Sequence, residues 1–550
     1  MKVRRVLGAG ISVVVLGVLC VPAGASTADR VGAQTGSGTV RLAAEQEPSC
    51  ADWISSCAGL LWGNWALGNQ TLPQALVVPP DGAYTPGAVL VDMPTLSAGP
   101  PMTVTYRIKP EAVWNDGQPI TSADFDYTWK QIATGKDVYD STGYSQIQSI
   151  DTSNPKVAVV TFKAPYAAWR DLFGGFYYLM PSHLLAGKDR HKAMKDGYAF
   201  SGGPWVLEGG KAGWKKGKTL TLVPNDKYWG TKPTIAKVIF QFIPDNSAEL
   251  QALTTGQVLA AYPEHQDGIL DALDKDSSLS SSVSYGNQFE ALFLNNAAFP
   301  LDSVAVRQAI AYATDRQAIV DSVLKPSVRQ GRVLQSFVVP TFKQYYAPAF
   351  SGYSLNLAKV DALMTGDGWT KQGGVWTKNG RPASITVSTT TGNEARSLTE
   401  QLWQSQMKAA GFTVTIKNQS PDVLFGQTLP KGTFSVALGS LTSSPDPGWC
   451  SIFCSQNIPT KKNGLAGQNF MRVSDPAIDA AWGSVDTTLD PAARVAAAQQ
   501  GQAVLAQDVA SIPLYQSPSI FAYDKTHIGG NVVDNTVMGP FFTMNEWVLK

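Results

Sequence analysis

The sequence predicts an α/β protein with more than one domain. Segments with the alternating apolar pattern of strands and segments with the periodicity of amphipathic helices follow one another along the chain. The chain has 550 residues, of which 44% are hydrophobic and 16% charged, enough for three or four domains of about 150 residues with buried cores. No internal repeat or long low-complexity linker interrupts the pattern, so we expect interwoven domains.

The N-terminal third of the chain is predicted to be rich in strands. Alternating apolar residues predict strands at residues 39–45, 102–108 and 156–162. A turn is expected at Asn115-Asp116-Gly117. The segment after it, residues 122–134, has apolar residues spaced for one helical face, and we expect Ser122 to cap that helix. The predicted inward residues are Phe125, Trp129 and Ile132.

The rest of the chain alternates strands with longer helices. Residues 203–245 predict three strands separated by turns, and residues 246–256 predict a helix that ends at Gly256. Three further helices are predicted, at residues 304–324, 393–412 and 493–509. The second should be followed by a strand, TVTIK. The predicted inward residues of the first are Val306, Ala309, Ile310, Ala313, Ile319, Val320 and Val323.

Residues 1–25 have the pattern of a secretory signal peptide. The basic start MKVRR precedes an uncharged apolar stretch, and Ala23-Gly24-Ala25 offers a small-x-small cleavage site. Residues 26–38 are small and polar and predict a flexible leader. We therefore expect an exported, extracellular or cell-envelope protein. Cys20 leaves a lipid anchor open, although Leu19 stands where lipoprotein signals usually have a small residue.

Four cysteines remain after the signal peptide. An even number in an exported chain favours disulfides, and of the three possible pairings the short spacings favour Cys50–Cys57 and Cys450–Cys454. A metal site is the rival interpretation. Because the four histidines are scattered and none is close in sequence to either cysteine pair, we expect no metal and no cofactor.

Charge and motifs exclude several function classes. The 44 basic and 43 acidic residues nearly cancel, which argues against a nucleic-acid-binding protein. Gly217-Lys218-Thr219 lacks the first glycine of a phosphate loop, and Ser153-Asn154-Pro155-Lys156 is broken by proline. A paired-carboxylate hydrolase stays open as an alternative, but no acidic motif singles itself out, and we expect no enzyme.

Several segments of the chain carry motifs in a fixed order. YRIKPEAVWNDGQPITSADFDYTW is similar to the pattern "W.DG.P.TA.D", and SGGPWVLEGG with LTLVPNDKYWG to the pattern "GTGPY.L…YWG". With these segments the chain resembles the oligopeptide/dipeptide family (family 5) of extracellular solute-binding proteins of ABC importers. IFQFIPDNSAELQALTTGQV and LFLNNAAFPLDSVAVRQAIAYATDRQAIV follow in family order. So do LGSLTSSPDPGWC, NFMRVSDPAIDAA and ASIPLYQSPSIFAY. The resemblance spans about residues 40–550. Most signature residues, among them Asp116, Arg307 and Asp315, should be architectural.

The resemblance implies a type II periplasmic-binding-protein-like fold, with two lobes joined by a hinge and an extra inserted domain. Lobe one would combine residues 39–73, 203–285 and 513–550, and lobe two would be residues 286–512. The inserted domain would be residues 74–202.

The resemblance also implies a function. The protein would capture peptides by hinge closure between the lobes and deliver them to a membrane permease, as a monomer. An oligosaccharide, a glycolipid or another small ligand is the alternative, because one anchor departs from the family pattern. Relatives usually place an amine-binding aspartate where this chain has Ser443.

Candidate ligand contacts lie where the two lobes would face each other. Aromatic residues would stack on the ligand, Arg396 would pair with a carboxylate, and the 443–449 loop would contact the ligand. The predicted ligand-binding residues are Gln46, Trp53, Trp65, Tyr285, Gln288, Arg396, Ser443, Asp446 and Trp449.

Overall fold

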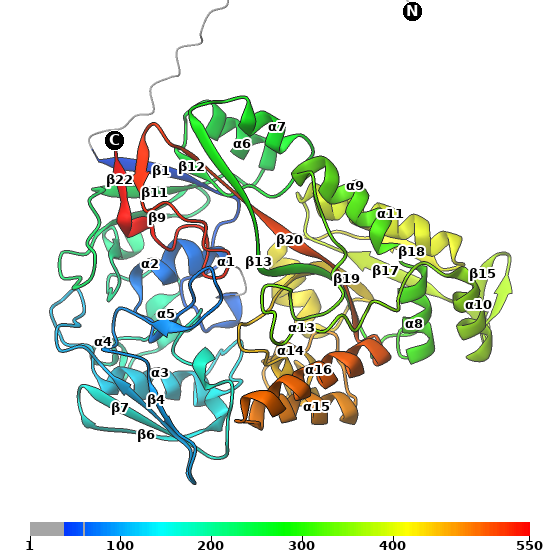
Figure 1. The fold of residues 1–550 in the computed structure, drawn as a ribbon, viewed down its shortest axis with the longest axis horizontal. Helices are drawn as coiled ribbons and strands as arrows, with labels where there is room; N and C mark the ends of the chain where they lie inside the picture. Colours follow the sequence, from blue (N-terminus) through cyan, green and yellow to red (C-terminus); the bar gives the residue numbers. More distant parts are fainter. Residues whose placement is uncertain (1–37, 59–60) are drawn as a thin grey trace, which may run out of the picture.

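A long mixed β-sheet organises the molecule. The computed structural model describes residues 38–58 and 61–550, and within them the sheet has eleven strands in the order β18-β17-β19-β13-β20-β12-β1-β11-β10-β8, with β9 paired to β10 (Figure 1). β13 (Leu279–Leu294) and β20 (Ser511–Asp524) are its longest strands and stand between two groups of shorter ones. Helices surround both groups, which confirms the predicted α/β class.

The first group of strands is built around β1. β1 (Thr39–Ala44) pairs in parallel with β11 (Lys237–Phe242) and β12 (Ala260–Ala261). Its residues Val40, Leu42, Ala43 and Ala44 are fully buried, as expected for a strand covered on both faces. The remaining strands are β10 (Thr219–Pro224), β8 (Trp205–Leu207) and β9 (Trp214–Lys215), all antiparallel.

The second group is built around β17. β17 (Ser384–Ser388) pairs in parallel with β18 (Thr413–Ile416) and with β19 (Val436–Thr442). Helix α11 (Glu394–Ala409) is the crossover between β17 and β18, which parallel strands require. The predicted helix at 393–412 and the strand after it are therefore confirmed.

β13 and β20 are antiparallel and join the two groups. The half of β20 near Asp524 pairs with β12, and β13 pairs from Gln288 to Leu294 with β19. Their ladder is interrupted twice. Glu290 pairs with Tyr515 but Ala291 pairs with Pro513, and, at the larger irregularity, Tyr285 pairs with Pro518 but the next pair is Phe289 with Gln516. Residues 286–288 therefore bulge out opposite the single residue Ser517. This larger irregularity lies where the strands pass from one group to the other.

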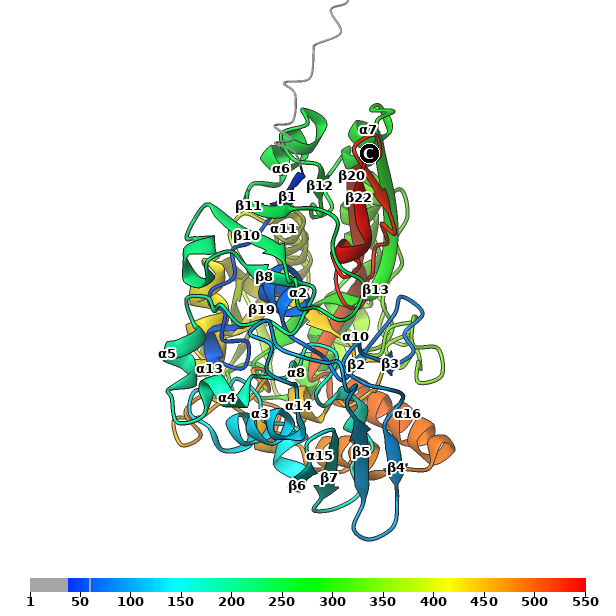
Figure 2. The ribbon, with the colours of Figure 1, turned by 90° about the vertical axis from the view of Figure 1, so that its left-hand side faces the viewer.

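A separate four-stranded sheet lies between β1 and β8 in sequence. Its order is β4 (Thr95–Ser97), β5 (Thr103–Arg107), β7 (Val157–Phe162) and β6 (Ile147–Asn154). Both views place it at the opposite end of the molecule from α6 and α7 (Figures 1 and 2). Helix α3 (Ser122–Thr134) packs beside it, but Thr121 is the cap: its side chain and that of Asp124 form a capping box. The prediction of Ser122 as the cap is wrong by one residue, because the cap is the preceding residue.

The segment predicted as one helix at 304–324 is two helices. α8 (Val304–Ala313) ends at Thr314, whose backbone is extended, and α9 (Arg316–Val328) begins after Asp315. The Asp315 carboxylate accepts a hydrogen bond from the Ala318 amide at 2.9 Å, so it caps the second helix. The inward residues of the prediction are all buried, because the break preserves the apolar face.

Further helices and short strands complete the fold. The predicted helices near 246–256 and 493–509 are α6 (Asn246–Thr254) and α16 (Pro491–Asp508). α10 (Leu357–Gly366) and α15 (Pro476–Thr487) had no predicted counterpart. The shorter helices are α1 (Leu61–Gly63), α2 (Asn69–Thr71), α4 (Ser182–Leu185), α5 (Arg190–Met194), α7 (Ile269–Asp274), α12 (Pro421–Val423), α13 (Leu429–Lys431) and α14 (Cys450–Phe453). The shorter strands are β2 (Leu76–Val77), β3 (Thr85–Pro86), β14 (Thr370–Gln372), β15 (Val375–Lys378), β16 (Arg381–Pro382), β21 (Ile528–Gly530) and β22 (Trp547–Leu549).

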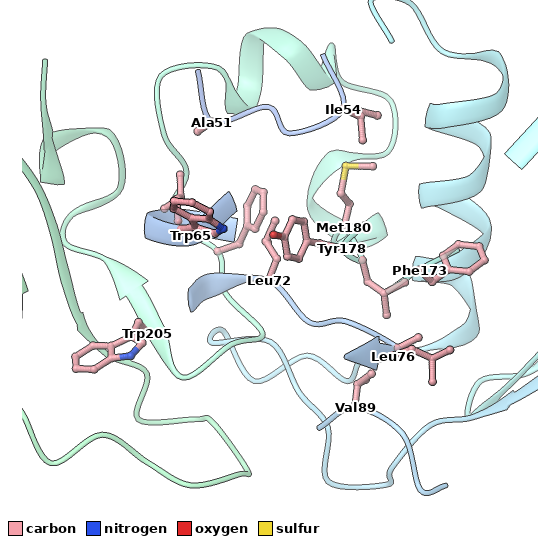
Figure 3. Close-up of a cluster of buried hydrophobic side chains, with 14 of the residues drawn as sticks. Ala51, Ile54, Trp65, Leu72, Leu76, Val89, Phe173, Tyr178, Met180 and Trp205 are labelled. Atoms are coloured by element: carbon pink, nitrogen blue, oxygen red, sulfur yellow. The ribbon is translucent and has the colours of Figure 1, made fainter. Parts of the chain in front are cut away.

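Buried hydrophobic residues form several cores. One core combines residues 40–260 with residues 521–547, and another lies within residues 289–510. A third joins the two strand groups, because it contains Ala43 and Ala261 from the first and Val387 and Val436 from the second. Figure 3 shows part of the first core, where the segment carrying Trp65 and Leu72 packs against Phe173, Tyr178 and Met180. This contact attaches the region of the four-stranded sheet to the β1 group.

The predicted signal peptide, Cys20 and all but the last residue of the predicted leader lie outside the described residues. In the part of the chain that the structure describes, we find no helix with the length and apolar character needed to span a membrane.

Candidate functional site

A cavity of about 480 Å³ lies against the middle of the long sheet. Its lining comes from both strand groups: residues 45–46 after β1, 53–58 and 61–65 on one side, and residues 440–452 on the other. Residues 139–177, from the region of the four-stranded sheet, close a third side, and the bulged residues Asn287 and Gln288 reach it from β13. Segments far apart in sequence therefore converge on one enclosed space, as is typical of a ligand site.

The structure brings together most of the residues predicted from the sequence. Seven of the nine predicted contacts line the cavity: Gln46, Trp53, Trp65, Gln288, Arg396, Ser443 and Trp449. Tyr285 and Asp446 are not among the lining residues. Tyr285 precedes the bulge in β13, and Asp446 is 3% exposed and forms an ion pair with Arg494.

Tryptophans form one wall of the cavity. Trp65 meets Trp62 and Tyr262 edge-on, with ring centroids 5.4 and 5.3 Å apart. Trp53 packs its edge against Tyr177 and Tyr178. Trp53 lies inside the loop closed by the Cys50–Cys57 disulfide, which confirms that predicted pairing and holds the loop at the cavity.

Trp449 belongs to the opposite wall and is also part of a core. It is 3% exposed and packs against Phe289, Phe337 and Phe453. Its indole Nε1 has no hydrogen-bond partner among the described residues. The next residue begins α14, which the predicted Cys450–Cys454 disulfide spans, so this wall is covalently fixed as well.

Arg396, in the first turn of α11, is already paired. Its Nε and Nη2 donate to the two carboxylate oxygens of Glu290 at 3.0 and 2.8 Å, and its Nη1 donates to Thr390 Oγ1 at 3.1 Å. Both partners are buried, with 8% and 5% of their surfaces exposed. A bidentate pair of this kind leaves the guanidinium little capacity for a ligand carboxylate.

Two more carboxylates border the same part of the cavity. Burial and the nearby charge of Glu264 raise the pKa of Glu45 to about 8. Burial also raises the pKa of Glu264, against the attraction of Arg396. We call Glu45, Glu264, Glu290 and Arg396 the Glu264 cluster. Three acidic groups share one guanidinium there, so the cluster has excess negative charge when its acids ionise.

A second acidic group lies beside the 443–449 loop. Asp171 accepts hydrogen bonds from Ser444 Oγ at 2.8 and 3.0 Å and from the Tyr84 hydroxyl. Burial and the charge of Asp446 raise the pKa values of Asp171 and Asp486 to about 7. We call Asp171, Asp446, Asp486 and Arg494 the Asp171 cluster. Arg494 pairs with Asp446 and also attracts Asp171 and Asp486, so in this cluster one guanidinium faces three carboxylates.

Polar atoms without partners face the cavity next to this cluster. Ser443 is fully buried and Asn287 is 3% exposed, and both line the cavity. The Ser443 amide donates to the Asn287 carbonyl at 2.7 Å, which holds the two residues together. Neither Ser443 Oγ nor Asn287 Oδ1 makes a hydrogen bond within residues 38–58 and 61–550. Such buried polar atoms are costly unless a ligand or water satisfies them.

The acidic residues were missed because single-sequence signals for them are weak. Glu45 is the last residue of the strand predicted at residues 39–45, whereas the predicted contact is its neighbour Gln46. Asp171, Glu264 and Glu290 belong to no motif, and only the folded chain brings them to one cavity. Glu47, the other acid at that strand end, accepts hydrogen bonds from Trp214 and the Gly217 amide instead.

One group of metal-compatible side chains lies outside the cavity. Ligand atoms of Asp52, Asp137 and His191 are within 4.8 Å of one another. The buried Arg190 donates to Asp52 Oδ2 at 3.0 Å, and His191 Nδ1 lies 3.1 Å from the same oxygen. The guanidinium thus supplies positive charge at this point, and we assign the group a structural role.

Comparisons with known proteins agree with the geometry. The model of the family described as bacterial extracellular solute-binding proteins, family 5 Middle, matches residues 98–457. The oligopeptide-binding protein OppA of Mycobacterium tuberculosis (strain ATCC 25618 / H37Rv) is 28% identical over 493 residues, covering 84% of this chain and 77% of OppA.

Solved structures share the fold over almost the whole described chain. A periplasmic EDTA-binding protein, EppA, has a TM-score of 0.81 at 24% identity, covering 93% of this chain and 96% of its own. The oligopeptide-binding protein AppA from Bacillus subtilis, in complex with a nonapeptide, has a TM-score of 0.80 at 18% identity, covering 93% and 99%. These likenesses confirm the predicted type II periplasmic-binding-protein fold.

Proposed function

Because the chain belongs to family 5 of the bacterial extracellular solute-binding proteins, we propose that it captures peptides for an ABC importer. The observation that carries this proposal is the cavity, which both strand groups line together. A ligand bound in this cavity would contact residues of both strand groups at once. The 28% identity with an oligopeptide-binding protein supports peptides as the ligand class.

Ligand capture would proceed by hinge closure. We propose the lobes predicted from the sequence: residues 39–73, 203–285 and 513–550 in lobe one, and residues 286–512 in lobe two, with 74–202 as the inserted domain. Both lobe boundaries then fall in or near β13 and β20, next to the bulge at 286–288. A ligand that contacts both lobes stabilises the closed form by its differential contacts, and the permease would recognise that form.

Different residues of the cavity would bind different parts of the ligand. Trp53, Trp65 and Trp449 would contact apolar parts of a peptide, and Gln46, Gln288 and Ser443 would hydrogen-bond its backbone. We retain Arg396 as a binding residue that acts through Glu290. Tyr285 and Asp446 would reach the ligand only after a hinge movement, because they do not line the cavity.

The protein would release its ligand unchanged. Its relatives in the comparisons are binding proteins, and the buried acids of the cavity can act through charge alone, without turnover. We propose that the mature chain works outside the cytoplasm as a monomer and that its macromolecular partner is a membrane permease.

The proposal is tested by a ligand screen. Thermal unfolding with a library of peptides of two to ten residues should show raised melting temperatures for a subset, because a ligand that binds only the folded state stabilises it. Oligosaccharides and a glycolipid headgroup serve as the comparison set. A rise with a non-peptide ligand and with no peptide of any length would refute the assignment to peptides. Cleavage of a bound peptide, read by mass spectrometry, would refute the absence of catalysis.

A further inference from the structure

The ionisable residues around the cavity are mostly acidic. The acidic lining residues are Glu45, Asp140, Asp171, Glu264, Glu290 and Asp486. Among the described lining residues, Arg396 is the one cation, and Glu290 already neutralises it in a bidentate pair. The molecule as a whole is nearly neutral, with a formal charge of +1, so this excess is local to the cavity. A low-dielectric space lined in this way favours cations.

All of these acids except Asp140 belong to one of the two clusters defined above. Asn287, beside the Asp171 cluster, and Glu290, in the Glu264 cluster, are three residues apart on β13. Both clusters therefore border one cavity from neighbouring positions of the same strand, so a single peptide would contact both.

Independent evidence for a ligand comes from acceptor atoms that lack partners. Beside the Asp171 cluster, Asn287 Oδ1 and Ser443 Oγ are buried, line the cavity and make no hydrogen bond to any described residue. An ammonium group with three donors would satisfy such acceptors together with Asp171. In the Glu264 cluster, His265 is 4% exposed and directs Nδ1 toward Glu264 Oε2, 3.7 Å away. Burial lowers the pKa of His265 to about 4, so it adds no charge there at neutral pH.

We propose that the cavity selects basic peptides, with one cationic group of the ligand in each acidic cluster. This inference rests on the proposed function and adds the class of peptide. The N-terminal ammonium binds at the Asp171 cluster, where Ser443 and Asn287 complete its hydrogen bonds. A lysine or arginine side chain binds at the Glu264 cluster. The described lining residues contribute no free cation for a C-terminal carboxylate, so amidated peptides bind as well as free acids do.

Isothermal titration calorimetry with matched peptides tests the inference. The probes are alanine tri- to pentapeptides in which one position carries lysine, norleucine or glutamate, each as free acid and as C-terminal amide. Norleucine keeps the alkyl chain of lysine and removes the ammonium. We expect at least tenfold tighter binding of the best lysine peptide over its norleucine match, and weaker binding of glutamate peptides. Equal binding of the three series would overturn the inference and leave peptide binding intact.

Variants locate the preference. Glu264→Gln should reduce the lysine-to-norleucine ratio at least fivefold, and Asp171→Asn should weaken every peptide with a free N-terminus more than its N-acetylated form. Glu394→Gln and Asp302→Asn make the same charge changes at exposed positions and should alter neither ratio. Ratios are read within each variant, so a change in stability does not affect them. Unchanged ratios in both cavity variants would refute the two-cluster assignment.

Spermidine separates this inference from the proposed function. If spermidine binds and no peptide does, the cationic site stands and the peptide assignment fails. If peptides bind with no preference for lysine, the peptide assignment stands and the cationic site fails.

Discussion

Arg396 and Glu290 form a bidentate ion pair across the floor of the cavity, from α11 to β13, with N–O distances of 3.0 and 2.8 Å. Both side chains are at least nine-tenths buried. Glu290 therefore neutralises the positive charge with which Arg396 would otherwise bind a ligand carboxylate. It also ties the start of a helix to the strand that crosses between the two strand groups.

Removing one partner of this pair should cost stability. Arg396→Gln leaves the Glu290 carboxylate buried without its cation, and we expect a loss of about 3–5 kcal/mol in the free energy of unfolding, measured by urea denaturation. Lys408→Gln, at an exposed position of the same helix, is the control and should change little. The double variant Arg396→Gln, Glu290→Gln should recover much of the loss. A single variant as stable as the control would contradict this account of the pair.

Trp449 should be probed by a conservative change. Its burial against Phe289, Phe337 and Phe453 means that Trp449→Ala would cost about 3–5 kcal/mol, so the affinity of that variant would be hard to interpret. Trp449→Phe keeps most of the packing and removes the unpartnered Nε1 donor. We expect about tenfold weaker ligand binding, or about 1.4 kcal/mol, with a nearly unchanged melting temperature. Trp369→Phe, a buried tryptophan that does not line the cavity, is the control, and equal affinities of the two variants would exclude Trp449 from the site.

Binding of a cationic ligand should release protons. The pKa values of Glu45, at about 8, and of Asp171 and Asp486, at about 7, are raised by burial and by neighbouring acids, so the empty cavity holds protons near neutral pH. A ligand cation stabilises the ionised forms and displaces those protons. Calorimetry at pH 7 in buffers of different ionisation enthalpy should show a net release, smaller in Glu45→Gln. Proton uptake, or a heat independent of buffer, would contradict this expectation.

The same groups set the pH dependence of stability in the empty protein. Their pKa values are raised on folding, from 4.5 for Glu45 and 3.8 for Asp171, so the folded state binds more protons than the unfolded chain between about pH 4 and 8. Their contribution to stability is complete below the unfolded pKa values and is lost as pH rises through the folded ones. The melting temperature should therefore fall from pH 5 to pH 8.5, and fall less steeply in Glu45→Gln. Identical slopes for the two proteins would remove Glu45 from this role.

The sequence predicted elements well where the pattern is local. Apolar periodicity within short windows identifies the strands β1, β5 and β7. It also identifies the helices α11 and α16, which have capping residues as well. The break between α8 and α9 was missed because Thr314 and Asp315 interrupt neither the apolar face nor the helix propensity strongly. The break becomes favourable through tertiary contacts: Arg316, buried after the break, donates to the backbone carbonyls of Leu334, Phe350 and Tyr353.

Part of the site could also be predicted, because some of its residues lie in segments that the sequence identifies. The aromatic residues and Arg396 occur in segments with a recognisable order, and most of them line the cavity. The acids became visible only in three dimensions, because Glu45, Asp171 and Glu290 come from three separate regions of the chain. Their excess charge is a property of the assembled cavity and of no single segment.

The antiparallel pairing of β13 with β20 gives the chain an unusual modularity. Phe293 pairs with Ser511, so the polypeptide leaves β13 and enters β20 at adjacent points of the long sheet. Everything between those residues is one continuous segment, which forms β17, β18 and β19 and carries Arg396, Ser443 and Trp449. Recombination between related genes could therefore replace one complete wall of the cavity with only two neighbouring junctions, and new ligand preferences could arise by exchange rather than by gradual substitution.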